Sequence, residues 1–127
     1  ILYRFFRRMQ SAYGTEGTDV IACIGPGISL DSFEVGDEVY EAFRTENFPM
    51  EYISVWKPET HKYHIDLWAA NRLQLSDFGV PPRQIENAGI CTYRQHEDFF
   101  SARRLGIKSG RILSGIMLNG QEKGERK

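Results

Sequence analysis

Residues 91–104 carry the side chains best suited to chemistry in this chain of 127 residues. The segment combines a hydroxyl and two adjacent aromatic rings with three arginines, namely Ser101, Phe99, Phe100, Arg94, Arg103 and Arg104. A guanidinium forks onto phosphate oxygens, and the face of an aromatic ring stacks on a planar base. The segment could therefore hold an anion or a base. The alternative is a structural loop, in which Phe99 and Phe100 fill the core while Arg103 and Arg104 pair with nearby carboxylates.

The histidines do not suggest a metal site within the chain. His61 and His64 are three residues apart in a segment predicted to pass from a turn into a strand, where this spacing points the two side chains to opposite faces. A protein zinc site needs three or four converging ligands. We therefore predict surface or capping roles for these histidines and no metal bound by this chain alone.

Gly25-Pro26-Gly27 lies between an apolar run and a predicted helix. Backbone N–H groups at a helix N-terminus can bind phosphate. However, neither glycine-rich phosphate-loop pattern, GxxxxGK or GxGxxG, is present. The favoured interpretation of this tripeptide is a plain turn.

Hydrophobic periodicity predicts the elements that position these residues. In the first half of the chain it predicts a helix over residues 1–13 that ends at Gly14. It then predicts a strand over residues 19–24, buried on both faces, and a helix capped by Asp31 or Ser32. The inward side of that second helix would consist of Phe33, Val35, Val39, Tyr40 and Phe43.

The second half begins with strands predicted at residues 52–56 and 62–65, separated by a turn. Asp66 is predicted to cap the clearest helix, and Gly79 to end it. Two further strands are predicted at residues 85–92 and 111–118. This order favours an α+β fold, layered as in α/β proteins, with a mixed β-sheet sandwich and helices on its outer faces.

Charge and composition exclude several classes of partner. Sixteen Lys and Arg against seventeen Asp and Glu leave a formal net charge of -1, so no long-range field attracts nucleic acid or an anionic membrane. No apolar stretch approaches the roughly 20 residues of a membrane-spanning helix. Cys23 and Cys91 each lie in a short apolar run, which predicts buried, reduced thiols. The expected location is the cytoplasm.

Several motifs occur in the order found in one known family. Residues 24–28 and 33–39 resemble the family's "IGPCIG" and "YEVGxEV", and residues 63–71 resemble "YHLDLWxAN". Later segments resemble "GV", "CTY", "FFSYRR" and "TGR", at Gly79-Val80, Cys91-Thr92-Tyr93, residues 99–104 and Gly110-Arg111. The chain therefore resembles the C-terminal half of the YfiH or laccase-domain family, also called polyphenol oxidase-like. Two departures are Gly27 for the family's Cys and Ala102 for its Tyr.

The resemblance implies an incomplete version of a three- or four-layered fold over residues 1–118, followed by a flexible polar tail over residues 119–127. The absence of a methionine at Ile1 also suggests that the chain begins within a domain. By resemblance, the complete protein is a purine nucleoside phosphorylase that acts on adenosine, inosine and methylthioadenosine and also deaminates adenosine. Its zinc would be held by two His and one Cys of the N-terminal half, so we expect this chain to be inactive alone.

Within the chain, the resemblance implies no catalytic residue and a substrate-side loop formed by Phe99, Phe100, Ser101, Arg103 and Arg104. The implied ligands are a purine nucleoside and phosphate. The implied partner is the missing N-terminal half, or a second copy that covers the same exposed surface. The alternative from a different class is a non-catalytic domain that binds a ligand or partner after losing its zinc-binding half.

Overall fold

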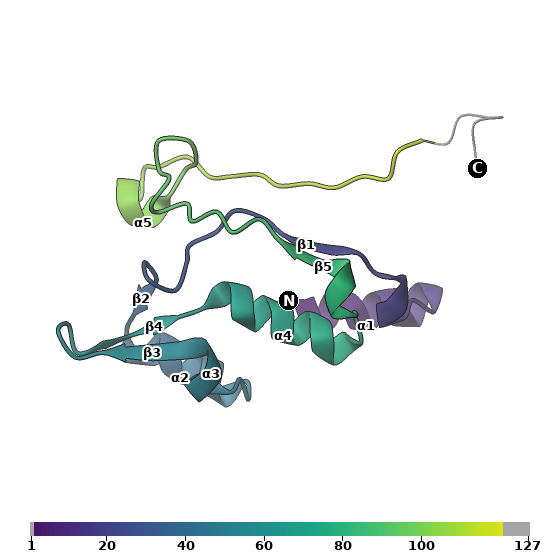
Figure 1. Cartoon of the computed structure of the whole chain (residues 1–127), viewed down its shortest axis with the longest axis horizontal. Helices are drawn as coiled ribbons and strands as arrows, with labels where there is room; N and C mark the ends of the chain where they lie inside the picture. The colour runs from purple at the N-terminus through teal and green to yellow at the C-terminus, as the bar shows by residue number, and fades with distance from the viewer. Residues whose placement is uncertain (1, 121–127) are drawn as a thin grey trace.

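The computed structural model describes residues 2–120 and contains helices packed on two small sheets (Figure 1). Ile1 and most of the predicted tail, residues 121–127, lie outside the described residues. The elements, in chain order, are α1 (Leu2–Tyr13), η1 (Gly17–Asp19), β1 (Ala22–Ile24), β2 (Glu34–Val35), α2 (Asp37–Thr45), α3 (Met50–Ile53), β3 (Ser54–Lys57), β4 (Lys62–Ile65), α4 (Leu67–Phe78), η2 (Pro82–Gln84), β5 (Ile85–Asn87) and α5 (Ala102–Leu105).

The two sheets differ in strand direction. Strands β1 and β5 pair in parallel, with Ala22 opposite Ile85. Strands β2, β4 and β3 form an antiparallel sheet in that order, with Val35 opposite Tyr63. Parallel and antiparallel pairing thus coexist with helices, and the predicted α+β fold is confirmed.

Helix α4 connects the two halves of the core. One buried cluster consists of Phe6, Ile24, Leu75, Val80 and Ile85, and the other of Val35, Met50, Ile53, Ile65 and Ala70. Leu75 and Ala70 belong to the same helix, α4, which lies in the centre of Figure 1 between the two sheets. Burial of apolar side chains is the main stabilising term, so α4 holds both sheets in one folded unit.

The ends of α4 form as the local sequence predicts. The side chain of Asp66 accepts a hydrogen bond from the backbone N–H of Ala69 at 3.0 Å. At the other end, Gly79 adopts φ 101°, a left-handed conformation that glycine tolerates at a helix terminus. Both capping predictions are confirmed.

The predicted start of α2 is wrong. Glu34 and Val35 form strand β2, and α2 begins only at Asp37, after Gly36. The two strand residues pair with β4, which comes almost thirty residues later in the sequence, and this pairing satisfies their backbone groups. Phe33 and Val35 still face the core, but from a strand and the residue before it.

The predicted strand over residues 52–56 is also displaced. Met50–Ile53 forms the short helix α3, and the strand begins at Ser54. Pro49 precedes this turn, and its carbonyl accepts the N–H of Ile53 at 3.2 Å. The β-forming residues of this segment are therefore divided between a helical turn and β3.

The strands of the parallel sheet are shorter than predicted. Strand β1 covers Ala22–Ile24, and Cys23 within it is exposed, so burial on both faces and a buried Cys23 are wrong. Strand β5 ends at Asn87, because Asn87 accepts the N–H of Gly89, which adopts φ 68° and turns the chain.

The strand predicted over residues 111–118 is absent, because this segment pairs with no strand among the described residues. It runs as an extended chain above β1 in Figure 1, and it carries exposed apolar side chains such as Leu113 and Ile116. No helix within residues 2–120 is both long and apolar enough to cross a bilayer.

Candidate functional site

The two segments that the sequence marked for chemistry lie next to each other. They leave the sheet at the carboxyl ends of the parallel strands β1 and β5. The backbone N–H of Gly27 donates to the carbonyl of Ile90 at 3.1 Å, and the N–H of Thr92 donates to the carbonyl of Gly27 at 3.1 Å. In sheets with parallel strands, ligands bind where the loops leave the carboxyl ends. The Gly25-Pro26-Gly27 turn and residues 91–104 therefore form one candidate site.

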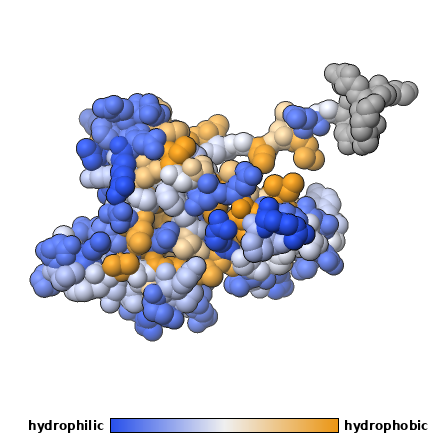
Figure 2. Space-filling model, in the orientation of Figure 1, coloured by the Kyte–Doolittle hydropathy of each residue, from blue (hydrophilic) through white to orange (hydrophobic). Residues whose placement is uncertain are grey.

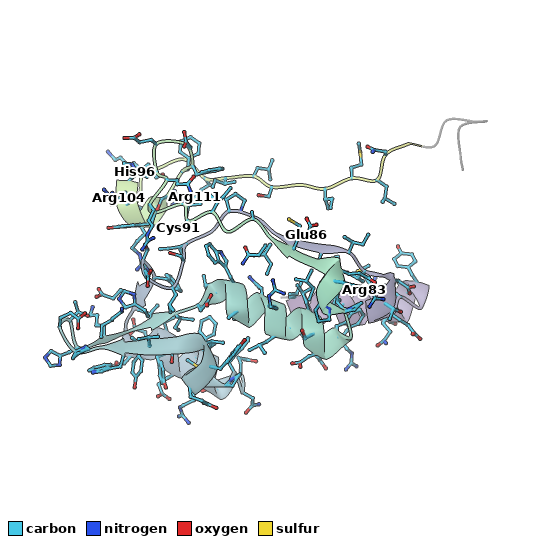
Figure 3. All side chains as sticks on the ribbon, in the orientation of Figure 1. Arg83, Glu86, Cys91, His96, Arg104 and Arg111 are labelled. Atoms are coloured by element: carbon cyan, nitrogen blue, oxygen red, sulfur yellow. The ribbon has the colours of Figure 1, made fainter. Side chains whose placement is uncertain are left out.

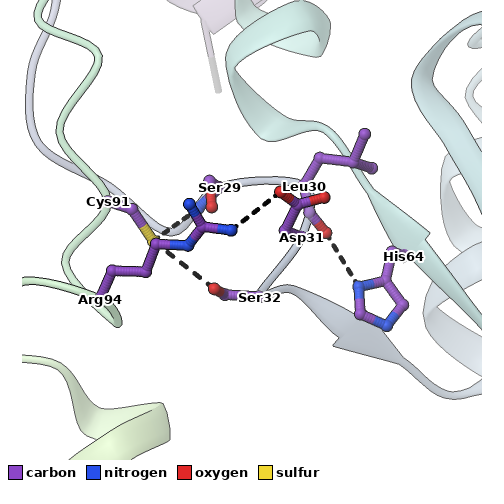
Figure 4. A network of polar contacts seen from close by, with 7 residues as sticks. All are labelled: Ser29, Leu30, Asp31, Ser32, His64, Cys91 and Arg94. Carbon is purple, nitrogen blue, oxygen red and sulfur yellow. Dashed lines mark hydrogen bonds and ion pairs between the residues drawn. The ribbon is translucent and has the colours of Figure 1, made fainter.

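Cys91 lies at the junction of these loops (Figure 4). Its side chain is 5% exposed, which confirms the predicted burial of this thiol. The sulfur accepts the backbone N–H of Ser29 at 3.4 Å and lies 3.7 Å from the hydroxyl of Ser32. Nearby, Nδ1 of His64 lies 2.9 Å from the carbonyl oxygen of Leu30. These contacts join the segment that follows β1, residues 29–32, to Cys91 on one side and to β4 on the other.

The pKa of Cys91 is lowered from 9.0 to about 7. Burial of the thiol acts in the opposite direction and would raise the pKa, but hydrogen bonds to the sulfur outweigh it. The groups around the sulfur that lower the pKa are the backbone N–H groups of Ser29 and Arg94 and the side chains of Ser29 and Ser32. A thiolate accepts such hydrogen bonds more strongly than a thiol, so the loop junction favours the charged form.

The lowered pKa of Cys91 predicts that the free energy of unfolding depends on pH. Between about pH 7 and pH 9 the folded thiol has lost its proton while the unfolded thiol keeps it, so the free energy of unfolding should rise with pH. We expect a rise on the order of 1–2 kcal/mol over this interval, measured by urea unfolding at several pH values. The rise should disappear in Cys91→Ser and persist in Cys23→Ser, whose thiol is exposed. An equal rise in wild type and Cys91→Ser would contradict the assignment.

Two arginines of the site are held by groups of the β1–β2 loop and of strand β2. Arg94 forms an ion pair with Asp31 at 3.0 Å. Arg103 donates a hydrogen bond to the backbone carbonyl of Glu34 at 2.6 Å, and its guanidinium lies 5.2 Å from the ring centre of Phe33. Both contacts fasten residues 91–104 to the segment that connects β1 with β2 and to the start of β2.

Arg104 is arranged differently. Its guanidinium lies over the ring of Tyr93, 4.8 Å from the ring centre. Its backbone N–H is capped by the hydroxyl of Ser101 at 3.3 Å, and Ser101 is buried. The helical turn α5 thus fixes where the Arg104 side chain begins, and the ring of Tyr93 lies beside its guanidinium. Figure 3 places Arg104 and Cys91 at the same end of the molecule, away from Arg83.

The structure only partly matches either interpretation of the aromatic pair. Phe99 is half-buried, whereas Phe100 is 55% exposed and its ring lies against the backbone of Gly110. Phe100 therefore does not fill the core. Arg103 and Arg104 also do not pair with carboxylates among residues 2–120, since the two ion pairs found there involve other arginines. Contact of this loop with a substrate remains a prediction.

The contacts of Tyr93, Ser29 and Ser32 with the site were not expected from the sequence. Tyr93 stands in the "CTY" motif, which the resemblance singled out without giving its tyrosine a role. The serines follow a glycine-rich turn and carry no distinctive spacing. The parallel bridge between Gly27 and Cys91 brings the two segments together and so places these serines near the sulfur.

The histidines occupy different environments. His61 adopts φ 54° in the turn between β3 and β4, and its ring lies 6.2 Å from that of Trp56. His64 is buried and bound to the carbonyl of Leu30, so a surface position is wrong for this residue. Within the described part of the chain, no three His, Cys, Asp or Glu side chains are grouped closely enough to hold a metal ion.

Taken together, the fold and the site define an α+β protein with a polar, arginine-containing site at the carboxyl ends of two parallel strands. The family model described as multi-copper polyphenol oxidoreductase laccase matches residues 1–119. The chain belongs to this family, which confirms the resemblance to YfiH and laccase-domain proteins.

Individual relatives carry enzyme names. The chain is 66% identical over 112 residues to a purine nucleoside phosphorylase of Bacteroides thetaiotaomicron, covering 88% of this chain and 42% of that protein. It is 53% identical to adenosine deaminase RL5 of an unknown prokaryotic organism, covering 75% of this chain and 36% of that protein. The chain thus spans only about two fifths of the length of these relatives.

Solved structures support the same relationship. The crystal structure of YlmD from Geobacillus stearothermophilus is 33% identical with a TM-score of 0.69, over 82% of this chain and 38% of that chain. The hypothetical protein YfiH of Bacillus licheniformis is 28% identical with a TM-score of 0.73, over 82% of this chain and 39% of that chain.

Proposed function

We propose that this chain forms the C-terminal part of a purine nucleoside phosphorylase and supplies the wall of its active site that faces the substrate. The observation that carries the proposal is the 66% identity to the Bacteroides thetaiotaomicron purine nucleoside phosphorylase over 112 residues. The stretch of similarity includes nearly the whole chain, 88% of it. The proposed substrates are adenosine, inosine and methylthioadenosine.

The proposed reaction is a transfer of the ribosyl group to phosphate. An oxygen of the phosphate dianion forms a bond to C1′ of the ribose while the bond from C1′ to the purine nitrogen breaks. The electron pair of the broken bond remains on the purine, which takes up the proton that the phosphate carried. The products are the free base and ribose 1-phosphate, or 5-methylthioribose 1-phosphate where the substrate is methylthioadenosine. Such a reaction needs a cation for the phosphate and a flat apolar surface for the base.

The loop of residues 99–104 provides groups of both kinds. Phe100 is exposed, and its ring lies next to Gly110. The ring is therefore held in place while it remains open to solvent. Arg103 and Arg104 follow on α5, whose first turn is capped by Ser101. We propose that the substrate-side loop is formed by Phe99, Phe100, Ser101, Arg103 and Arg104. In this proposal Ser101 and one of the two arginines hold the loop in place.

The activity named for adenosine deaminase RL5 suggests a second reaction at the same site. This chain is 53% identical to that protein over 95 residues. In deamination, water replaces the amino group of adenosine, and ammonia leaves with inosine as the other product. The reaction uses no phosphate, which makes it a useful control for the first.

The zinc implied by the family resemblance does not fit the residues of this chain. Such an ion would supply Lewis acidity at the reacting bond. Within residues 2–120 no three potential ligands are grouped, His64 is bound to a backbone carbonyl and Cys91 is surrounded by serines. We therefore assign no step of the reaction in this chain to a metal, and we propose that the zinc ligands lie in the other part of the protein.

We further propose that the N-terminal part of the same protein covers an apolar groove of about 870 Å³. The groove is bordered by α1, β1, α4 and residues 114–116, and includes Phe5, Ile21 and Ile116, which are all more than half exposed. Figure 2 shows hydrophobic surface on the extended segment and in the hollow beneath it. A groove lined by several large, exposed apolar side chains favours association. We place the assembled protein in the cytoplasm, in keeping with the two free thiols of this chain.

The test joins this chain to the preceding sequence of its own gene and compares it with the chain alone. With inosine and inorganic phosphate, the joined protein should release hypoxanthine and ribose 1-phosphate, and the chain alone should release neither. The same comparison with adenosine should give adenine and, from deamination, ammonia. A folded, joined protein that releases no base from inosine, adenosine or methylthioadenosine would refute the proposal. It would favour instead a non-catalytic domain that binds a ligand or partner.

A further inference from the structure

The arginines around the loop junction are not equivalent, and their contacts separate them. Arg94 is paired with Asp31 at 3.0 Å. Arg103 donates to the carbonyl of Glu34 at 2.6 Å. Arg111 donates to the carbonyl of Ser109 at 2.5 Å. Each of these guanidinium groups therefore has at least one N–H committed to this chain.

Arg104 is the exception among these four arginines. Within residues 2–120, no side-chain hydrogen bond or ion pair is formed by its guanidinium, which is solvent-exposed. The group is nevertheless not loose, because it lies 4.8 Å from the ring centre of Tyr93 and its backbone is capped by Ser101. A guanidinium stacked on an aromatic ring keeps the N–H groups along its edge free. Such an edge matches two oxygens of an oxyanion.

We infer that Arg104, held in place by the ring of Tyr93, is the guanidinium that binds the phosphate, and that Arg103 positions the loop. This assignment rests on the proposed function and names the residue that binds one of its two substrates. Arg103 is less suited to the same role, because one of its N–H groups already donates to the carbonyl of Glu34, whereas Arg104 has no such commitment within residues 2–120. The adjacent arginines therefore divide two tasks, one structural and one directed at the anion.

The test compares Arg104→Gln with the matched control Arg103→Gln in the joined, full-length enzyme. With saturating inosine, Arg104→Gln should raise the KM for inorganic phosphate at least about tenfold, because charge-assisted hydrogen bonds to the anion are lost. Deamination of adenosine should remain within about twofold of wild type, because that reaction needs no phosphate. Arg103→Gln should lower thermal stability and raise the phosphate KM clearly less than Arg104→Gln does, because it loosens the loop but removes no contact to the anion. Arg104→Lys, which keeps the charge but not the fork, should give an intermediate KM.

Tyr93 offers a second, independent readout. Tyr93→Phe keeps the ring and should preserve the phosphate KM, whereas Tyr93→Leu removes the stacking surface and should raise it severalfold. The inference is overturned if Arg104→Gln leaves the phosphate KM unchanged, if Arg103→Gln raises it equally, or if phosphorolysis and deamination fall together. A wild-type enzyme that shows no phosphorolysis would instead refute the proposed function, so the two failures are distinguishable.

Discussion

Replacing Gly17 with alanine is expected to destabilise this chain more than the same replacement at its other described glycines. Gly17 is buried in η1, and a Cβ atom at this position would lie 2.2 Å from the backbone carbon of Gly79 and 2.5 Å from its oxygen. The neighbour is backbone and not the end of a flexible side chain, so it cannot move aside locally. We expect the free energy of unfolding to fall by about 3 kcal/mol or more, measured by urea unfolding.

Gly115→Ala provides the matched control for this substitution. A Cβ atom at Gly115 has no neighbour within 4 Å, and its backbone φ lies outside the range that favours glycine. The same chemical change should therefore alter stability by no more than about 0.5 kcal/mol. If the two variants unfold at the same urea concentration, the backbone of Gly17 in η1 does not pack closely against Gly79 at the end of α4.

The contact at Gly17 shows why parts of the fold could not be predicted from the sequence. The stop of α4 was predictable, since Gly79 ends an apolar periodic segment and allows a left-handed conformation. Its start was predictable from Asp66 for the same local reason. The need for glycine at position 17 comes from Gly79, which lies 62 residues further along the chain. No local pattern carries that information.

The strands illustrate the same limit. Glu34 and Val35 are strand residues because they pair with His64 and Tyr63, and the local pattern alone favoured a helix. Conversely, the apolar sequence of residues 111–118 predicts a strand, but this segment pairs with no strand within the described part of the chain. Strands depend on partners elsewhere in the sequence, whereas the ends of a helix depend on adjacent residues.

The candidate site was predictable in location but not in detail. The types of residues in 91–104 marked the segment, and burial of Cys91 was foreseen. The different contacts of Arg103 and Arg104 were not, because they arise from Glu34 on β2 and from Tyr93 at the start of the loop. Two identical, adjacent residues acquire separate environments only when the chain is folded.

The site depends in turn on the core beneath it, and Ile65 is the residue where this dependence is strongest. Ile65 is fully buried in the cluster around β4, and its backbone N–H donates to the carbonyl of Phe33 at 3.2 Å. The ring of Phe33 lies under the guanidinium of Arg103. Ile65 is therefore linked to Arg103 and residues 99–104 through one intervening residue, Phe33.

Ile65→Ala should accordingly destabilise the chain by about 3–4 kcal/mol, because it removes buried methyl groups and leaves a cavity. Val55→Ala is the control, since Val55 lies on the neighbouring strand β3 but is 41% exposed, and it should cost less than about 1 kcal/mol. Urea unfolding of both variants measures the difference. Equal losses would mean that the antiparallel sheet does not bury β4 against α2 and α4. A selective loss in Ile65→Ala would show that Ile65 is packed in the core beside Phe33, on which Arg103 lies.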